Sequence, residues 1–123
     1  MKSALILFAH GARDPGWAEP IRKLQIKVSA QRPDLVVETA FLEFSEPLLP
    51  AAIERLAARE CRQIAIVPVF LAQGGHLKND VPRLLDEMRA RFPGIAIDLW
   101  PALGDAEPVL DAISTWIVNT APR

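Results

Sequence analysis

The chain contains two histidines, His10 and His76, and each of them follows an apolar run. A glycine pair, Gly74 and Gly75, separates one of these runs from its histidine. A carboxylate, Glu43, stands in a comparable place after another apolar run. Imidazole and carboxylate groups suit divalent iron, cobalt, nickel or zinc, and imidazole also accepts protons near neutral pH. These three side chains predict a metal site, a proton-transfer site, or both.

The number of candidate ligands indicates what kind of metal site this would be. A structural zinc site usually closes with four ligands, often including cysteines, whereas three ligands leave positions open for a substrate. Two plainer interpretations stay open beside the functional one. The histidines could only hydrogen-bond the strand ends, and Glu43 could be a solvated carboxylate or a helix cap.

Apolar patterning places these residues between predicted strands and helices. Runs typical of strands cover residues 4–9, 35–42, 63–70 and 95–100. Pro68 lies inside the third run and predicts a bulge or irregularity, because it cannot donate a ladder hydrogen bond. Asp14 with Pro15 predicts the start of the first helix, and Pro47 the start of the second. The predicted apolar helix faces are Trp17, Ile21, Leu24 and Val28; Leu49, Ile53 and Leu56; Val81, Leu84, Leu85 and Met88; and Val109, Leu110, Ile113, Trp116 and Ile117.

The order βαβαβαβα predicts an α/β fold with three layers, in which helices cover a four-stranded parallel sheet. In such sheets, ligands bind outside the carboxyl ends of the strands. His10, Glu43 and His76 fall at or just beyond the carboxyl ends of the first three predicted strands. With a strand order of 2-1-3-4, these strands are neighbours. We therefore expect all three side chains to converge on one site.

Composition limits the classes of partner. The 123 residues fit a single domain, 1–123, and half of them are hydrophobic. A net charge of −1, with acids and bases mixed along the chain, marks no nucleic-acid or membrane surface. No run approaches the ~20 apolar residues that span a bilayer. The single cysteine, Cys61, fits buried packing in a reducing compartment, so we expect a cytoplasmic protein.

Several phosphate-handling interpretations are disfavoured by missing residues. The chain has no Gly-x-x-x-x-Gly-Lys-Ser/Thr loop, no dinucleotide fingerprint and no Gly-x-Ser-x-Gly nucleophile motif. Histidine phosphatases place an arginine directly before the catalytic histidine, whereas this chain has Ala9 there. Phosphate transfer through His10 therefore stays a minor alternative, which would require a phosphoenzyme.

Three stretches occur in an order that is informative as a set. They are residues 8–15 (FAHGARDP), residues 40–44 (AFLEF) with Pro47 following, and residues 67–82 (VPVFLAQGGHLKNDVP). Together they resemble the short CbiX-type sirohydrochlorin chelatases, class II tetrapyrrole chelatases that insert cobalt, iron or nickel without a nucleotide. The resemblance runs from Leu5 to about Pro82 and is only architectural beyond Ile95. Ala12 departs from the family, which often has serine there.

The resemblance implies roles for individual residues. His10 and His76 are similar to the metal ligands, and one of them could also accept a pyrrole proton. Glu43 resembles the acidic partner of that site, as a ligand or a proton acceptor. Arg13 and Lys78 flank the histidines and are candidates to bind the carboxylates of the macrocycle, the plainer interpretation being surface charge. Gly74 and Gly75 would let the loop approach a flat ring, with an ordinary turn as the alternative.

The resemblance also implies an activity and partners. We expect a lyase-class metal chelatase that acts on sirohydrochlorin in cobalamin or siroheme biosynthesis, with no cofactor besides the substrate metal (Co²⁺, Fe²⁺ or Ni²⁺). Long members of the family have two such domains facing a cleft, so this chelatase-like half would form a homodimer. The alternative is a non-catalytic module that binds and delivers the metal or the tetrapyrrole. Multiple-turnover kinetics distinguish the two.

Overall fold

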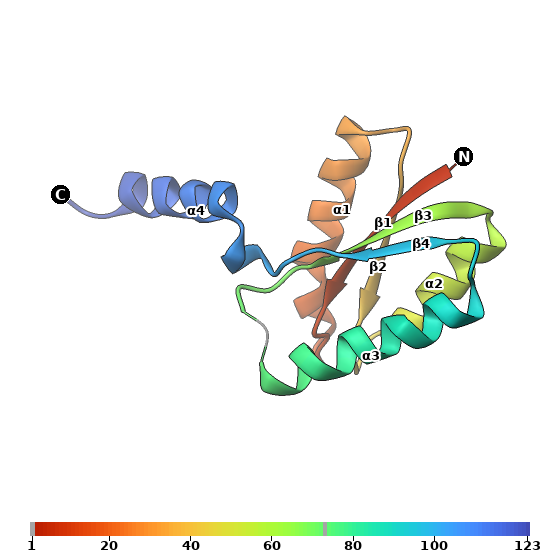
Figure 1. Ribbon diagram of the computed structural model, residues 1–123. Helices are drawn as coiled ribbons and strands as arrows, with labels where there is room; N and C mark the ends of the chain where they lie inside the picture. The colour runs from red at the N-terminus through yellow and green to blue at the C-terminus, as the bar shows by residue number, and fades with distance from the viewer. Residues whose placement is uncertain (1, 73) are drawn as a thin grey trace.

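Four parallel strands form one sheet at the centre of the protein, in a computed structural model that describes residues 2–72 and 74–123 without the side chains of His76 and Leu77. The strands are β1 (Lys2–Ala9), β2 (Val36–Phe41), β3 (Cys61–Pro68) and β4 (Ala96–Leu99). Their order is β2-β1-β3-β4. This confirms the predicted parallel α/β sheet and its order, and it makes β1, β2 and β3 neighbours (Figure 1).

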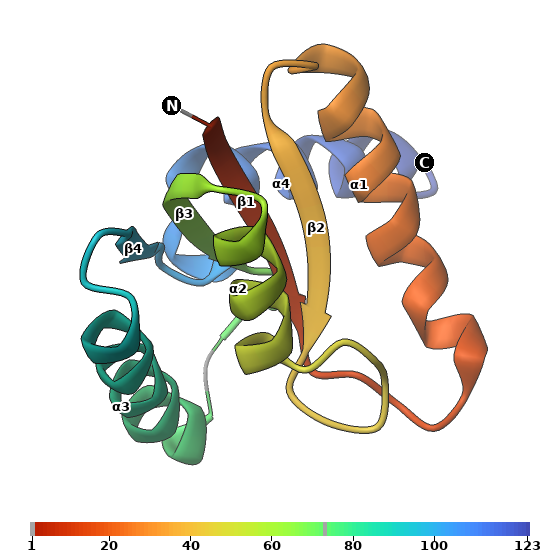
Figure 2. The same cartoon turned by 90° about the vertical axis from the view of Figure 1, so that its right-hand side faces the viewer.

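Four α-helices alternate with the strands: α1 (Glu19–Gln31), α2 (Leu49–Ala58), α3 (Gly75–Arg91) and α4 (Glu107–Thr120). Helices α2 and α3 cover one face of the sheet, and α1 covers the opposite face (Figure 2). Side chains of β1 alternate between these two faces, because successive residues of a strand point to opposite sides. None of the described helices is both long and apolar enough to cross a membrane.

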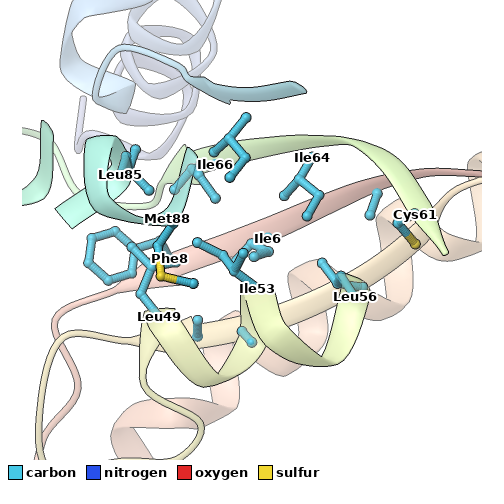
Figure 3. Packing of buried hydrophobic residues seen from close by; sticks show 14 of the residues in the cluster. Ile6, Phe8, Leu49, Ile53, Leu56, Cys61, Ile64, Ile66, Leu85 and Met88 are labelled. Atoms are coloured by element: carbon cyan, nitrogen blue, oxygen red, sulfur yellow. The ribbon is translucent and has the colours of Figure 1, made fainter. Parts of the chain in front are cut away.

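The larger apolar cluster lies between the sheet and helices α2 and α3 (Figure 3). Ile6, Ile53 and Leu56 are fully buried within it. Cys61 is also buried there, which confirms the packing role expected for it. Burial of these apolar side chains is the main favourable term in folding, so the cluster fixes how β1 and β3 lie. The carboxyl ends of both strands, and the loops that follow them, are positioned by this packing.

Helix starts differ from the predicted ones by a few residues. Asp14 accepts a hydrogen bond from Gly16 N at 2.9 Å, but it caps a 3-10 turn, η1 (Pro15–Ala18), that precedes α1. Helix α2 begins at Leu49 rather than at Pro47, because Phe41 N donates to Pro47 O at 2.9 Å and Leu48 bridges to Phe41. The segment before α2 therefore extends the sheet edge beside β2.

The prediction of a strand irregularity at Pro68 was wrong. Pro68 pairs in register with Phe8, and the shift in the β1–β3 ladder lies at the other end, between Lys2 and Ser3. Val69 N donates to Phe8 O at 2.7 Å, so the amide position of Pro68 faces the β4 side. Pairing of β3 with β4 ends at Ile66, so the missing donor of Pro68 lies where no ladder bond is needed.

The last helix departs from the expectation that helices cover the sheet. Helix α4 contacts the short turn η2 (Leu103–Asp105) and has no buried residue. Figure 1 shows it extending away from the sheet, beyond the ends of β3 and β4. Its predicted apolar face exists, but it has no partner within the described chain.

Candidate functional site

The loops that carry His10 and Glu43 are joined at the carboxyl edge of the sheet. Leu42 N donates to Ala9 O at 2.9 Å, and Glu43 N donates to His10 O at 3.1 Å. These bonds continue the β1–β2 ladder one step beyond the strands, because neighbouring parallel strands end at the same edge. Both side chains are exposed. The structure thus joins the backbones of two of the three residues whose side chains were predicted to converge.

Gly11 makes this close approach of the two loops possible. Its φ is +84°, a conformation that L side chains rarely adopt. A Cβ at this position would collide with the carbonyl oxygen of Glu43. The Ser45 hydroxyl donates to Ala12 O at 3.2 Å, and Ser45 N donates to Glu43 O at 2.8 Å. The backbone around His10 is therefore held by the Glu43 loop.

A mostly apolar cavity of about 470 Å³ opens beside His10. Its walls come from the β1 and β2 ends, from η1 and from the start of α1. A pocket of this size with few polar groups is typical of a site for an organic ligand. Its lining residues are Ala9, His10, Gly11, Ala12, Trp17, Ala18, Pro20, Ile21, Phe41, Ser45 and Val69.

Aromatic side chains gather at the same edge, and sequence patterning assigned none of them to the site. The rings of His10 and Phe70 lie 4.8 Å apart, centroid to centroid. Arg13 Cζ lies 4.9 Å from the centroid of the Phe44 ring, and Phe44 is 56% exposed at a φ of +64°. An exposed aromatic residue in the left-handed region is uncommon, and such conformations cluster at functional sites.

Trp17 was wrongly predicted to belong to the buried face of the first helix. It is 72% exposed and lines the cavity beside His10. The cause is the 3-10 turn Pro15–Ala18, which gives Trp17 a different direction from the α-helical face of Ile21, Leu24 and Val28. The presence of Pro15 and Gly16 directly before Trp17 was the available signal.

The first turn of α3 and its N-cap carry the remaining predicted residues. The backbone of His76 lies in the first turn of α3, but its side chain lies outside the described parts, so its convergence with His10 stays a prediction. Gly74 is the N-cap of α3 and Gly75 is its first residue. A Cβ at either glycine would meet none of the described atoms within 4 Å. The described neighbours would therefore leave room for a side chain at either position, in contrast to Gly11.

Cationic side chains lie near both histidines in the sequence, one on the loop after β1 and one in the first turn of α3. Arg13 is exposed and its guanidinium covers the Phe44 ring. Lys78 is exposed in the first turn of α3, where its backbone N donates to Gly74 O at 3.2 Å. Among the described side chains, no three His, Cys, Asp or Glu residues form a group able to hold a metal ion. With His76 outside that search, the predicted set of His10, Glu43 and His76 is not tested by it.

Comparison with protein families and with solved structures gives consistent matches. A family model described as CbiX matches residues 4–119. A protein named sirohydrochlorin cobaltochelatase, from Methanocaldococcus jannaschii, is 43% identical over 82 residues, which cover 67% of this chain and 57% of that protein. The chain thus spans little more than half the length of the curated relatives that it matches.

Two solved structures share the fold along nearly the whole chain. A putative cobalamin biosynthesis CbiX protein from Marinobacter aquaeolei has a TM-score of 0.82 at 30% identity, with 95% of both chains covered. The sirohydrochlorin chelatase SirB from Bacillus subtilis, in complex with cobalt, has a TM-score of 0.80 at 27% identity. That match covers 98% of this chain and 52% of SirB. One relative therefore has the size of this chain, and the other is about twice as long.

Proposed function

Because this chain belongs to the CbiX family, we propose that it is a metal chelatase of the lyase class that inserts a divalent metal ion into sirohydrochlorin. The observation that carries the proposal is the junction of the His10 and Glu43 loops at the carboxyl edge, next to an apolar cavity of about 470 Å³. A flat macrocycle needs an apolar wall, and a metal ion needs basic groups beside it. This edge supplies both, within the single chelatase-like domain 1–123.

Insertion exchanges two pyrrole N–H protons for one metal ion. In the proposed reaction, His10 and His76 hold the incoming metal, with Glu43 as the acidic partner. His10 or Glu43 accepts the two pyrrole protons one after the other, since both are exposed and can pass each proton to solvent. Three ligands leave coordination positions that the macrocycle nitrogens can take. The chelate effect of the ring drives the exchange, so no nucleotide is required.

Recognition of the macrocycle is assigned to the rim of the cavity. The exposed faces of Trp17 and Phe44 offer aromatic surface to a flat ring. Arg13 and Lys78 are proposed to bind its carboxylates by charge-assisted hydrogen bonds. The open space over Gly74 and Gly75 supports their proposed role, because side chains there would occupy room that the ring needs.

Cobalt is the metal to test first. A curated relative is named as a cobaltochelatase, and the SirB structure holds cobalt. Histidine and carboxylate ligands do not by themselves separate cobalt from iron or nickel, because affinity follows the general divalent series. We therefore propose Co²⁺ as a substrate, with Fe²⁺ and Ni²⁺ as competitors whose relative rates identify the pathway, cobalamin or siroheme.

The decisive assay follows the absorbance change of sirohydrochlorin with Co²⁺ under anaerobic conditions. The protein should accelerate insertion over buffer through many turnovers. His10→Ala and His76→Ala should each lower kcat/KM by roughly 100-fold or more, the scale of a lost acid–base group. Gln31→Ala, at the far end of α1, is the matched control and should keep the wild-type rate.

The possible outcomes separate the functions. Wild-type rates in both histidine variants would remove the catalytic assignment. Stoichiometric binding of the metal or of the macrocycle without turnover would instead indicate a delivery module.

The proposal also includes assembly and location. We propose a homodimer whose two carboxyl edges face one cleft, which the size match to half of SirB supports. We propose the reducing cytoplasm as its location, which the buried free thiol of Cys61 supports.

A further inference from the structure

The guanidinium of Arg13 lies over the ring of Phe44, at the edge of the sheet that carries His10. Arg13 Cζ is 4.9 Å from the ring centroid, within the range in which a cation is attracted to an aromatic face. The ring is 56% exposed and belongs to neither apolar cluster. The described partner of this ring is therefore a cation and not the core.

The backbone of Phe44 has a conformation that needs support. Its φ is +64°, and a non-glycine residue keeps such a conformation only where the surrounding structure fixes it. The next residue provides this support on two sides. Ser45 N donates to Glu43 O at 2.8 Å, and the Ser45 hydroxyl donates to Ala12 O at 3.2 Å. The loop of Phe44 is thus tied to the residue directly before Arg13, which holds the two loops beside each other.

A second arginine–phenylalanine pair lies at the amino edge of the sheet, where α3 ends. Arg91 Cζ is 5.2 Å from the centroid of the Phe92 ring. The same guanidinium also donates to a carboxylate oxygen of Glu54 at 2.9 Å. In this pair, one arginine is supported by a ring and binds a carboxylate at the same time. The chain itself supplies all three groups.

The Arg13–Phe44 pair has no carboxylate of this kind. Every Asp and Glu of the chain is among the described residues, and none of them forms an ion pair with Arg13. Its sequence neighbour Asp14 accepts from Gly16 N at 2.9 Å as the cap of η1. A carboxylate that completes the Arg13–Phe44 pair, as Glu54 completes the other, therefore has to come from a bound molecule.

A ring beneath a guanidinium prepares it for such a carboxylate. The planar cation carries its N–H donors in a fixed fork, and stacking on a ring leaves these donors available. Stacking also restricts the side-chain rotamers, so less freedom is lost when the carboxylate binds. Glu43, directly before Phe44, is joined to His10 by the bond from Glu43 N to His10 O at 3.1 Å. The prepared guanidinium therefore lies on the two loops that flank the predicted metal site.

From these observations we propose that Phe44 is a positioning residue that acts through Arg13. Its ring holds the guanidinium so that this group binds one carboxylate at the rim of the macrocycle. A flat ring held only at its metal centre can turn in its own plane, whereas a second contact at the rim fixes its rotation. This inference rests on the proposed function, because it takes the macrocycle as the source of the carboxylate.

A double-mutant cycle tests whether Phe44 acts through Arg13. The dissociation constant of metal-free sirohydrochlorin is measured by fluorescence titration for the wild type, Phe44→Leu, Arg13→Ala and the double variant. Phe44→Leu should raise this constant roughly 3-fold or more, the scale of a lost cation–π contact. In the Arg13→Ala background the same substitution should change it by less than ~1.5-fold, because the group that the ring positions is gone. Effects that simply multiply would show that Phe44 contacts the macrocycle directly, and would overturn the proposal.

Two further variants separate positioning from a general structural effect. Phe44→Tyr keeps the ring and should retain the wild-type dissociation constant. Phe92→Leu removes the ring beneath Arg91 and should retain it as well. With Co²⁺ present, Phe44→Leu should raise KM while kcat stays close to the wild-type value, since the ring positions a binding group and touches no reacting atom. A fall in kcat at unchanged KM would contradict this role.

Fold and assembly are followed in the same variants by circular dichroism and sedimentation velocity, and both should match the wild type. Loss of assembly in Arg13→Ala would place a carboxylate of a second copy on this guanidinium and would overturn the proposal. Coupled binding effects without metal insertion would support the inference and count against the chelatase reaction. Metal insertion with uncoupled binding effects would count against the inference alone.

Discussion

At the scale of single residues, the contact between Gly11 and Glu43 sets the geometry beside His10. The predicted consequence is that Gly11→Ala separates the two loops, because the added Cβ collides with the Glu43 carbonyl at a φ of +84°. The left-handed conformation alone costs an L residue about 1–2 kcal/mol. We expect the free energy of unfolding in urea to fall by at least that amount, and chelation to fall with it.

Gly75→Ala is the matched control for this substitution. Gly75 opens α3 and has free space around it, and alanine is the better helix former. Its stability should be unchanged or raised by less than ~1 kcal/mol. A loss of chelation in this folded variant would support the role of Gly75 at the ring, whereas equal stability losses in both variants would contradict the steric argument for Gly11.

Arg13 provides a second test at this scale. If its guanidinium binds a carboxylate of the macrocycle, Arg13→Ala should raise the KM for sirohydrochlorin by roughly 10-fold or more, because a hydrogen bond to a charged group contributes about 1.5–3 kcal/mol. Arg55→Ala, exposed in the last turn of α2 at the opposite edge of the sheet, should leave KM unchanged. Equal effects of the two variants would indicate only general charge attraction.

At the scale of elements, helix α2 packs the larger apolar cluster against the sheet. Leu56 is fully buried against the sheet, whereas Ile26 on α1 is 68% exposed. Leu56→Ala should lower the free energy of unfolding by about 2–5 kcal/mol, the range for leaving a cavity in a core. Ile26→Ala should change it by less than ~0.5 kcal/mol. Urea denaturation followed by circular dichroism gives both values, and similar losses would show that the cluster is poorly packed.

At the scale of the whole molecule, the fold should not depend on metal. Both apolar clusters form without His10 or Glu43, which lie outside them at the sheet edge. Treatment with a chelator should therefore leave the far-UV circular dichroism spectrum and the thermal midpoint unchanged, unlike a structural zinc domain, which unfolds without its ion. Unfolding on metal removal would show that metal is a structural component, contrary to its proposed role as substrate.

The sequence by itself determined the α/β class and the edge at which His10 and Glu43 meet, whereas the strand order was an assumption that the structure confirmed. This was possible because strand and helix periodicities are local, and because parallel strands must end at one edge. The burial of Trp17, the irregularity at Pro68 and the packing of α4 on the sheet were predicted wrongly for the opposite reason. The direction of the turn that carries Trp17, the strand that faces the amide position of Pro68 and the presence of a packing partner for α4 each depend on residues far away in the chain.

Only the tertiary structure could decide that Gly11 fits against Glu43 and that no described atom lies close to a Cβ at Gly74 or Gly75. The sequence shows three glycines near histidines, but a glycine's role depends on what a Cβ would contact. The same holds for α4. Its apolar side is evident from the sequence, but the absence of a packing partner for it within the described chain appears only in the folded structure. Local pattern determines which element forms, and the surrounding packing determines what that element is free to do.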